Sequence, residues 1–77
     1  IVHIKLFTPW TSWTWYLIEY SPKEKLAFGL VQGQETELGY ISIEELEDIW
    51  GPVGLKIERD IHWIPKPLSE VRKSLKK

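Results

Sequence analysis

Residues 38–63, LGYISIEELEDIWGPVGLKIERDIHW, combine a strand, a helix, a tight turn and a returning strand in one stretch. Ser42 and Glu45 form a capping box, in which the two side chains satisfy backbone amides left free at a helix start. Apolar residues then recur at helical spacing as far as Trp50. The stretch therefore predicts a helix over residues 43–50 with one buried face.

The sequence GPVG at residues 51–54 should end this helix, because proline cannot continue it and glycine reverses the chain easily. Apolar and polar side chains then alternate over residues 55–63, which is typical of a strand with one buried face. We expect the buried side of that strand to carry Leu55, Ile57, Arg59, Ile61 and Trp63.

Alternating patterns also predict strands over residues 2–7, 13–20, 26–32 and 38–41, joined by short turns. Gly29 interrupts the third of them and indicates a bulge or a close backbone approach. Apolar residues at helical spacing predict a final helix over residues 68–75. The expected fold is α+β, a single small domain over residues 1–77. Its mainly antiparallel sheet of four to five strands carries one capped helix between the last strands and a C-terminal helix. The predicted core is Leu6, Trp15, Leu17, Phe28, Leu30, Leu46, Trp50, Ile57 and Ile61.

Composition limits the possible classes of protein. The 77 residues include five tryptophans and no cysteine, so the core is thin, aromatic and without disulfides. The net charge is −1, which favours neither nucleic acid nor an anionic membrane. No apolar run approaches the roughly 18 residues of a membrane span, and we expect a cytoplasmic protein. Because the chain starts at Ile1 without methionine, we expect it to begin inside a longer gene product.

Several segments carry a family resemblance: KLFTPW, WTWYLIEY, FGLV, ELGYISIEELE, GPVGLKIERDIHW and PLSE. Together they resemble a bacterial family known as domain of unknown function 2958. The resemblance implies a plasmid or mobile-element context and assigns no catalytic residue. Members commonly carry an N-terminal helical segment that this chain lacks, so we expect an open apolar groove beside Val2, Ile4 and Leu6.

Three polar residues at alternate positions form the sharpest candidate site. Glu58, Asp60 and His62 lie on one face of the predicted strand, about 7 Å apart. Two carboxylates and one imidazole suit a divalent metal if a bulge or His3 closes the site. The alternative is an ordinary solvent-facing side of a half-buried strand.

Two further sets of side chains are candidate binding residues. Trp10, Trp13, Trp15 and Tyr16 would form an aromatic platform for a partner protein or for bases, unless they pack in the core. Arg59 falls on the apolar side of its strand, where it needs a partner such as Glu19 or Glu45, or binds an anion.

Charge is segregated along the chain. Residues 35–48 hold acids and no base, whereas the last part of the chain is basic. The basic residues either contact phosphate or form a solvated helix end. They are Lys66, Arg72, Lys73, Lys76 and Lys77.

We expect a non-enzymatic module that binds a partner protein and needs no cofactor. The rival hypothesis is a metal-dependent enzyme that uses Glu58, Asp60 and His62, and nucleic-acid binding is the third. Plentiful aromatic residues and scarce catalytic sets favour the first hypothesis.

Overall fold

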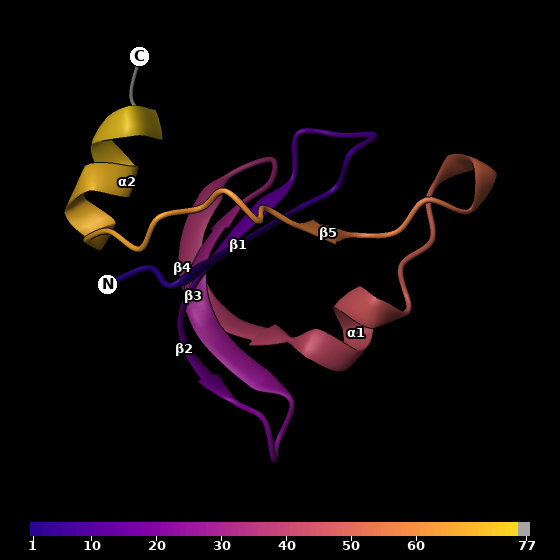
Figure 1. Ribbon diagram of the computed structural model, residues 1–77, viewed down its shortest axis with the longest axis horizontal. Helices are drawn as coiled ribbons and strands as arrows, with labels where there is room; N and C mark the ends of the chain where they lie inside the picture. Colours follow the sequence, from indigo (N-terminus) through magenta and orange to yellow (C-terminus); the bar gives the residue numbers. More distant parts are fainter. Residues whose placement is uncertain (76–77) are drawn as a thin grey trace.

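The computed structural model describes residues 1–75, which form a five-stranded antiparallel sheet with a helix on either side (Figure 1). The strand order is β4-β3-β2-β1-β5. This confirms the predicted α+β fold. The elements are β1 (Ile4–Phe7), β2 (Thr14–Ser21), β3 (Leu26–Gln32), β4 (Thr36–Ser42), α1 (Ile43–Glu47), a 3-10 turn (Pro52–Gly54), β5 (Glu58–Arg59) and α2 (Leu68–Leu75).

The sheet buries apolar side chains on both of its faces. On the face covered by α1, which we call the α1 face, the buried cluster is Trp15, Leu17, Ala27, Ile41 and Leu46. On the opposite face, the α2 face, the buried cluster is Val2, Tyr16, Leu30 and Val71. Neighbouring residues of β2 therefore enter different clusters, as expected for a central strand with two apolar faces.

Gly29 makes the close approach that the sequence predicts. A Cβ atom at this position would collide with the backbone carbonyl of Tyr16 on β2. The register between β2 and β3 also shifts here, between Leu17 and Glu19. The shift is a β-bulge, and it changes which face the later residues of β2 occupy. Tyr20 consequently pairs with Ala27, a member of the α1-face cluster.

Helix α1 is shorter than predicted. It begins at Ile43, and the Ser42 hydroxyl accepts a 3.3 Å hydrogen bond from the Glu45 amide, as the capping box predicts. It ends at Glu47, and the expected extension to Trp50 is wrong. The cause lies in the tertiary structure, because Trp50 forms an antiparallel bridge with Lys56 instead of a further helical turn.

The predicted strand over residues 55–63 is also mostly wrong. Only Glu58 and Arg59 pair with β1. The chain then turns, because the Asp60 carboxylate accepts a 3.0 Å hydrogen bond from the His62 amide and the Asp60 carbonyl accepts one from the Trp63 amide. Ile57, before the turn, packs on the α1 face. Trp63, after the turn, packs on the α2 face.

Most of the predicted core packs in or against the two clusters, but two positions are wrong. Trp50 is 65% exposed and Ile61 is 82% exposed. Both fall in segments where the expected regular element is absent. The groove expected beside the first strand is open only in part, because Val2 is fully buried on the α2 face, whereas Leu6 lines an open apolar cavity on the α1 face. Within residues 1–75, no helix is long and apolar enough to cross a bilayer.

Candidate functional site

The four aromatic residues proposed as a platform do not share a surface. Trp15 and Tyr16 are buried on opposite faces of the sheet. Trp13 is partly exposed, packs against Trp15 with ring centroids 6.0 Å apart, and covers Gly33. Trp10 is half-buried. These side chains mainly build the core and hold loops, as the alternative interpretation expects.

Arg59 lies directly opposite Leu6 of β1, so it is on the α1 face, the apolar side that the sequence predicts. It is exposed on the short strand β5, so it needs no buried partner. Neither Glu19 nor Glu45 forms an ion pair with it. Within residues 1–75 the only ion pair joins Lys5 and Asp60, with 3.9 Å between Nζ and Oδ2.

The structure does not bring Glu58, Asp60 and His62 together. The strand that would align them ends at Arg59, and Asp60 turns to bond with the backbone of His62 and to pair with Lys5. Glu58 and His62 are exposed, and His3 does not join them. In the described part of the chain no three His, Cys, Asp or Glu side chains converge as ligands of one ion.

The basic residues near the C-terminus are divided between two places. Lys66 lies over the ring of Trp63, with Nζ 4.6 Å from the ring centroid. Arg72 and Lys73 are exposed on α2, where they line a shallow cavity with Thr36 of β4. Lys76 and Lys77 lie outside the described residues.

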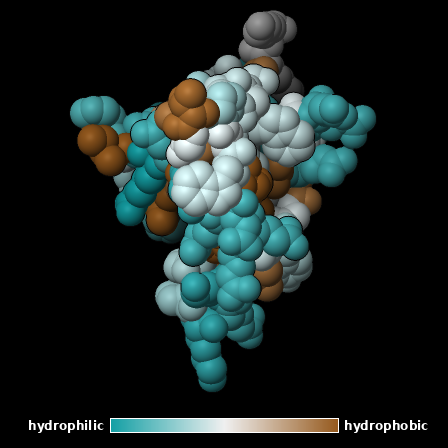
Figure 2. All heavy atoms as spheres, turned by 90° about the vertical axis from the view of Figure 1, so that its right-hand side faces the viewer, coloured by the Kyte–Doolittle hydropathy of each residue, from teal (hydrophilic) through white to brown (hydrophobic). Residues whose placement is uncertain are grey.

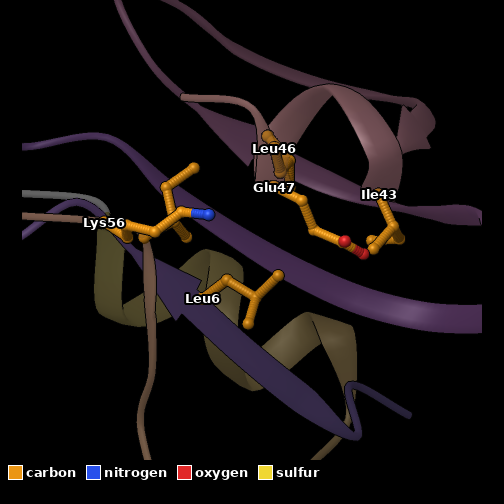
Figure 3. Close-up of a pocket in the computed structure, with 6 residues that line it drawn as sticks. Leu6, Ile43, Leu46, Glu47 and Lys56 are labelled. Atoms are coloured by element: carbon orange, nitrogen blue, oxygen red, sulfur yellow. The ribbon is translucent and has the colours of Figure 1, made fainter. Parts of the chain in front are cut away.

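An open apolar cavity of about 330 Å³ lies between α1 and β1 (Figure 3). Its walls are the side chains of Leu6, Ile43, Leu46 and Ile57, with Glu47 and Lys56 beside them. Figure 3 shows these side chains converging from the helix, from the strand and from the segment that returns toward β5. The cavity can accept an apolar side chain, but it has few polar groups that would orient a reacting substrate.

The most unusual surface is the loop at residues 49–55, which we call the apolar loop. Val53 is 97% exposed and has a φ of +50°, which a β-branched residue rarely adopts. Ile49, Trp50 and Leu55 are also exposed. Figure 2 faces this side of the molecule, and apolar and near-neutral side chains gather in its upper half above a largely polar lower part.

Several contacts fix the shape of the apolar loop. The Gly51 amide donates a 2.7 Å hydrogen bond to the Leu55 carbonyl. The Trp10 ring covers Gly51 so closely that a Cβ atom there would lie 2.5 Å from the ring. At the base of the loop, Nζ of Lys56 sits 4.5 Å from the centroid of the Trp50 ring, at cation–π distance. The loop therefore presents its apolar side chains in a fixed conformation.

The sequence does not reveal this surface, because GPVG predicts an ordinary turn and the helical spacing predicts a buried Trp50. The available signal was the placement of valine between proline and glycine in GPVG, where turns usually carry polar residues.

Comparison with known families agrees with the segments that suggested a resemblance. The model of a family described as protein of unknown function (DUF2958) matches residues 2–74, nearly the whole chain. The chain belongs to the DUF2958 family. No curated protein and no solved structure matches it. For this DUF2958 protein, evidence on function therefore comes from its own geometry.

Proposed function

We propose that this DUF2958 protein is a non-enzymatic module that binds a partner protein through the apolar loop at residues 49–55. The observation that carries the proposal is Val53, which combines almost complete exposure with a left-handed backbone. Strained residues persist where the surroundings enforce them, and they cluster at binding and switch sites. Val53 is almost fully exposed, so packing within this chain does not offset the cost of its left-handed backbone. In this proposal, binding to a partner offsets that cost.

Trp50 supplies the second part of the argument. Tryptophan is enriched among the residues that dominate binding energy at protein interfaces, because a rigid ring buries a large area at low entropic cost. Here the ring is 65% exposed and held beside Lys56. A partner with an apolar pocket and a nearby acid would fit the ring and the Lys56 ammonium together.

The resemblance adds a context to this proposal. We place the protein in the bacterial cytoplasm and on a plasmid or other mobile element, where small proteins commonly act by occluding or recruiting host factors. The metal-dependent alternative has less support, because Glu58, Asp60 and His62 do not converge in the described part of the chain.

The test is affinity capture from a lysate of the source bacterium, with bound proteins identified by mass spectrometry. Three baits are compared with the wild type: Trp50→Ser, Val53→Asn and Lys25→Asn. Lys25 is the matched control, because it is exposed and also has a positive φ, of +52°, but lies in the β2–β3 turn.

We expect one protein to be captured by the wild type and by Lys25→Asn, and to be lost with the two loop variants. Recovery of the same proteins by all four baits, or of none, contradicts the proposal. Circular dichroism of each variant establishes that lost capture is not lost folding.

A further inference from the structure

Strand β4 forms one edge of the sheet, and on its outer side no strand pairs with it in residues 1–75. It is seven residues long and pairs with β3 without a register shift. Proteins usually shield such an edge with a bulge, a proline or inward charges. Strand β4 has no bulge or proline, and its inward charge is Glu37, which pairs with Val31 on the α1 face. It also carries Leu38, 44% exposed, and Tyr40, 76% exposed. The outer backbone groups of β4 can therefore pair with another strand, and apolar side chains lie beside them.

We propose that β4 pairs antiparallel with β4 of a second copy of this chain, about a two-fold axis at Gly39. Gly39 is the midpoint of Thr36–Ser42, so this is the register in which the whole strand pairs. A Cβ atom added at Gly39 would meet nothing within 4 Å, so a side chain can be placed on the face of the sheet at the proposed axis. This inference goes beyond the proposed function and uses a different surface.

The proposed register extends the apolar rows of one sheet into the other. Within one chain, Leu38 lies opposite Leu30, and Tyr40 lies opposite Phe28 with ring centroids 5.3 Å apart. Pairing about Gly39 sets Leu38 of each copy opposite Tyr40 of the other. Each row then crosses the interface, from Leu30 and Leu38 of one copy to Tyr40 and Phe28 of the other. Aromatic and aliphatic pairs of this kind stabilise antiparallel sheets.

The charge on β4 excludes one competing register. Pairing about Gly39 places Glu37 opposite Ile41, and the two Glu37 side chains lie about 13 Å apart along the strands. A register centred on Glu37 would instead bring two carboxylates directly opposite each other, which is destabilising. Of the alternatives, pairing about Gly39 therefore gives the longest ladder and separates the acids.

Each end of the strand has charges of both signs nearby. Glu35 and Glu37 lie at the Thr36 end, and Lys23 and Lys25 lie in the β2–β3 turn at the other. Arg72 and Lys73 of α2 lie at the Thr36 end of β4. A cavity of about 190 Å³ near the other end is lined by Tyr40, Leu26, which pairs with Ser42, and the acids Glu19 and Glu24. Figure 1 shows α2 and the β2–β3 turn at opposite ends of the sheet. Antiparallel pairing therefore brings charges of both signs together at each end, so charge at the strand ends does not decide between pairing and separation.

The first test measures the mass of the chain in solution by sedimentation equilibrium, from micromolar to millimolar concentration. We expect a dimer within this range, held by backbone hydrogen bonds and by the apolar rows. Tyr40→Lys should raise the dimer dissociation constant at least about tenfold. The control is Ile61→Lys, which makes the same kind of change at an exposed residue outside β4 and should leave the dimer intact. A wild type that stays monomeric throughout overturns the proposal.

The second test fixes the register, using the absence of cysteine from the sequence. In the proposed dimer, two Gly39→Cys side chains face each other across the axis, at a Cα separation of about 4.5–5.5 Å that a disulfide can span. Mild oxidation should give a covalent dimer of Gly39→Cys and leave Ile61→Cys monomeric. Equal cross-linking of both variants, or of neither, overturns the proposal.

Discussion

The indole N–H of Trp63 donates a 3.1 Å hydrogen bond to the carbonyl oxygen of Val2, a residue 61 positions earlier in the chain. The Trp63 ring also packs against Tyr16, with centroids 5.7 Å apart. Val2 is fully buried and forms an antiparallel bridge with Lys66. These contacts join the two ends of the described chain over the α2 face of the sheet.

Trp63→Phe should lower the free energy of unfolding by about 1 kcal/mol, because it removes one hydrogen bond and keeps an aromatic ring in place. The Val2 carbonyl retains its bond from the Lys66 amide, which limits the loss. Urea unfolding followed by circular dichroism measures the effect. Trp50→Phe is the control, because that ring is exposed, and it should change stability by less than about 0.5 kcal/mol. Equal effects of the two variants would contradict the role of the Trp63 bond.

Gly29→Ala should destabilise the protein by about 3 kcal/mol or prevent folding, because the new methyl group collides with the Tyr16 backbone, which cannot move aside freely. Gly39→Ala is the matched control, since Gly39 pairs directly with Gly29 and has open space around it. It should change stability by less than about 0.5 kcal/mol. Thermal and urea unfolding, at a concentration too low for self-association, compare the two. A tolerated Gly29→Ala would disprove the close contact.

Val53→Asn should raise the free energy of unfolding by about 1 kcal/mol, because asparagine tolerates a left-handed backbone better than valine does. The side chain is almost fully exposed, so little packing is lost. Lys25→Asn should give a smaller gain, because lysine is not β-branched. If Val53→Asn proves less stable than the wild type, Val53 has a packing role that its exposure does not suggest.

Alkaline pH should destabilise the protein in a way that depends on Tyr16. Burial raises the pKa of the Tyr16 hydroxyl above its ordinary value of 10.0. As the pH rises past 10.0, the unfolded chain loses this proton first, so the free energy of unfolding falls until folded Tyr16 also ionises. Below that range the contribution of Tyr16 is constant.

Tyr16→Phe should therefore show a smaller fall in stability between about pH 9 and 11 than the wild type. Tyr40→Phe removes a hydroxyl from an exposed ring and should keep the wild-type profile. Urea unfolding at stepped pH measures the three profiles. Identical slopes for all three proteins would count against burial of the Tyr16 hydroxyl.

Asp60→Ala should cost about 1 kcal/mol, because it removes both the bond to the His62 amide and the partly exposed ion pair with Lys5. The loss should be the same with and without added Mg²⁺, Mn²⁺ or Zn²⁺, since the side chains of Glu58 and His62 do not converge on Asp60. Differential scanning calorimetry measures both quantities. A metal-dependent rise in melting temperature that disappears in Asp60→Ala would revive the metal-site hypothesis.

Local sequence patterns determined the parts of this fold that depend on neighbouring residues. Ser42 sets the start of α1, because its hydroxyl satisfies an amide three residues ahead. Strand β3 has the predicted bounds, and the spacing of Leu68, Val71 and Leu75 identified α2. Gly29 indicated the close approach of β2, since only glycine fits beside a backbone carbonyl.

Contacts between residues that are not neighbours in the sequence decided the rest. The end of α1 depends on the bridge between Trp50 and Lys56, and the face on which Trp63 packs depends on a hydrogen bond to Val2. Alternation over residues 55–63 cannot reveal the turn at Asp60, because a polar residue at that position suits a strand as well as a turn. Trp50 and Val53 are exposed because the loop that carries them lies on the surface of the folded chain. Only the tertiary structure therefore distinguishes this apolar surface from a core.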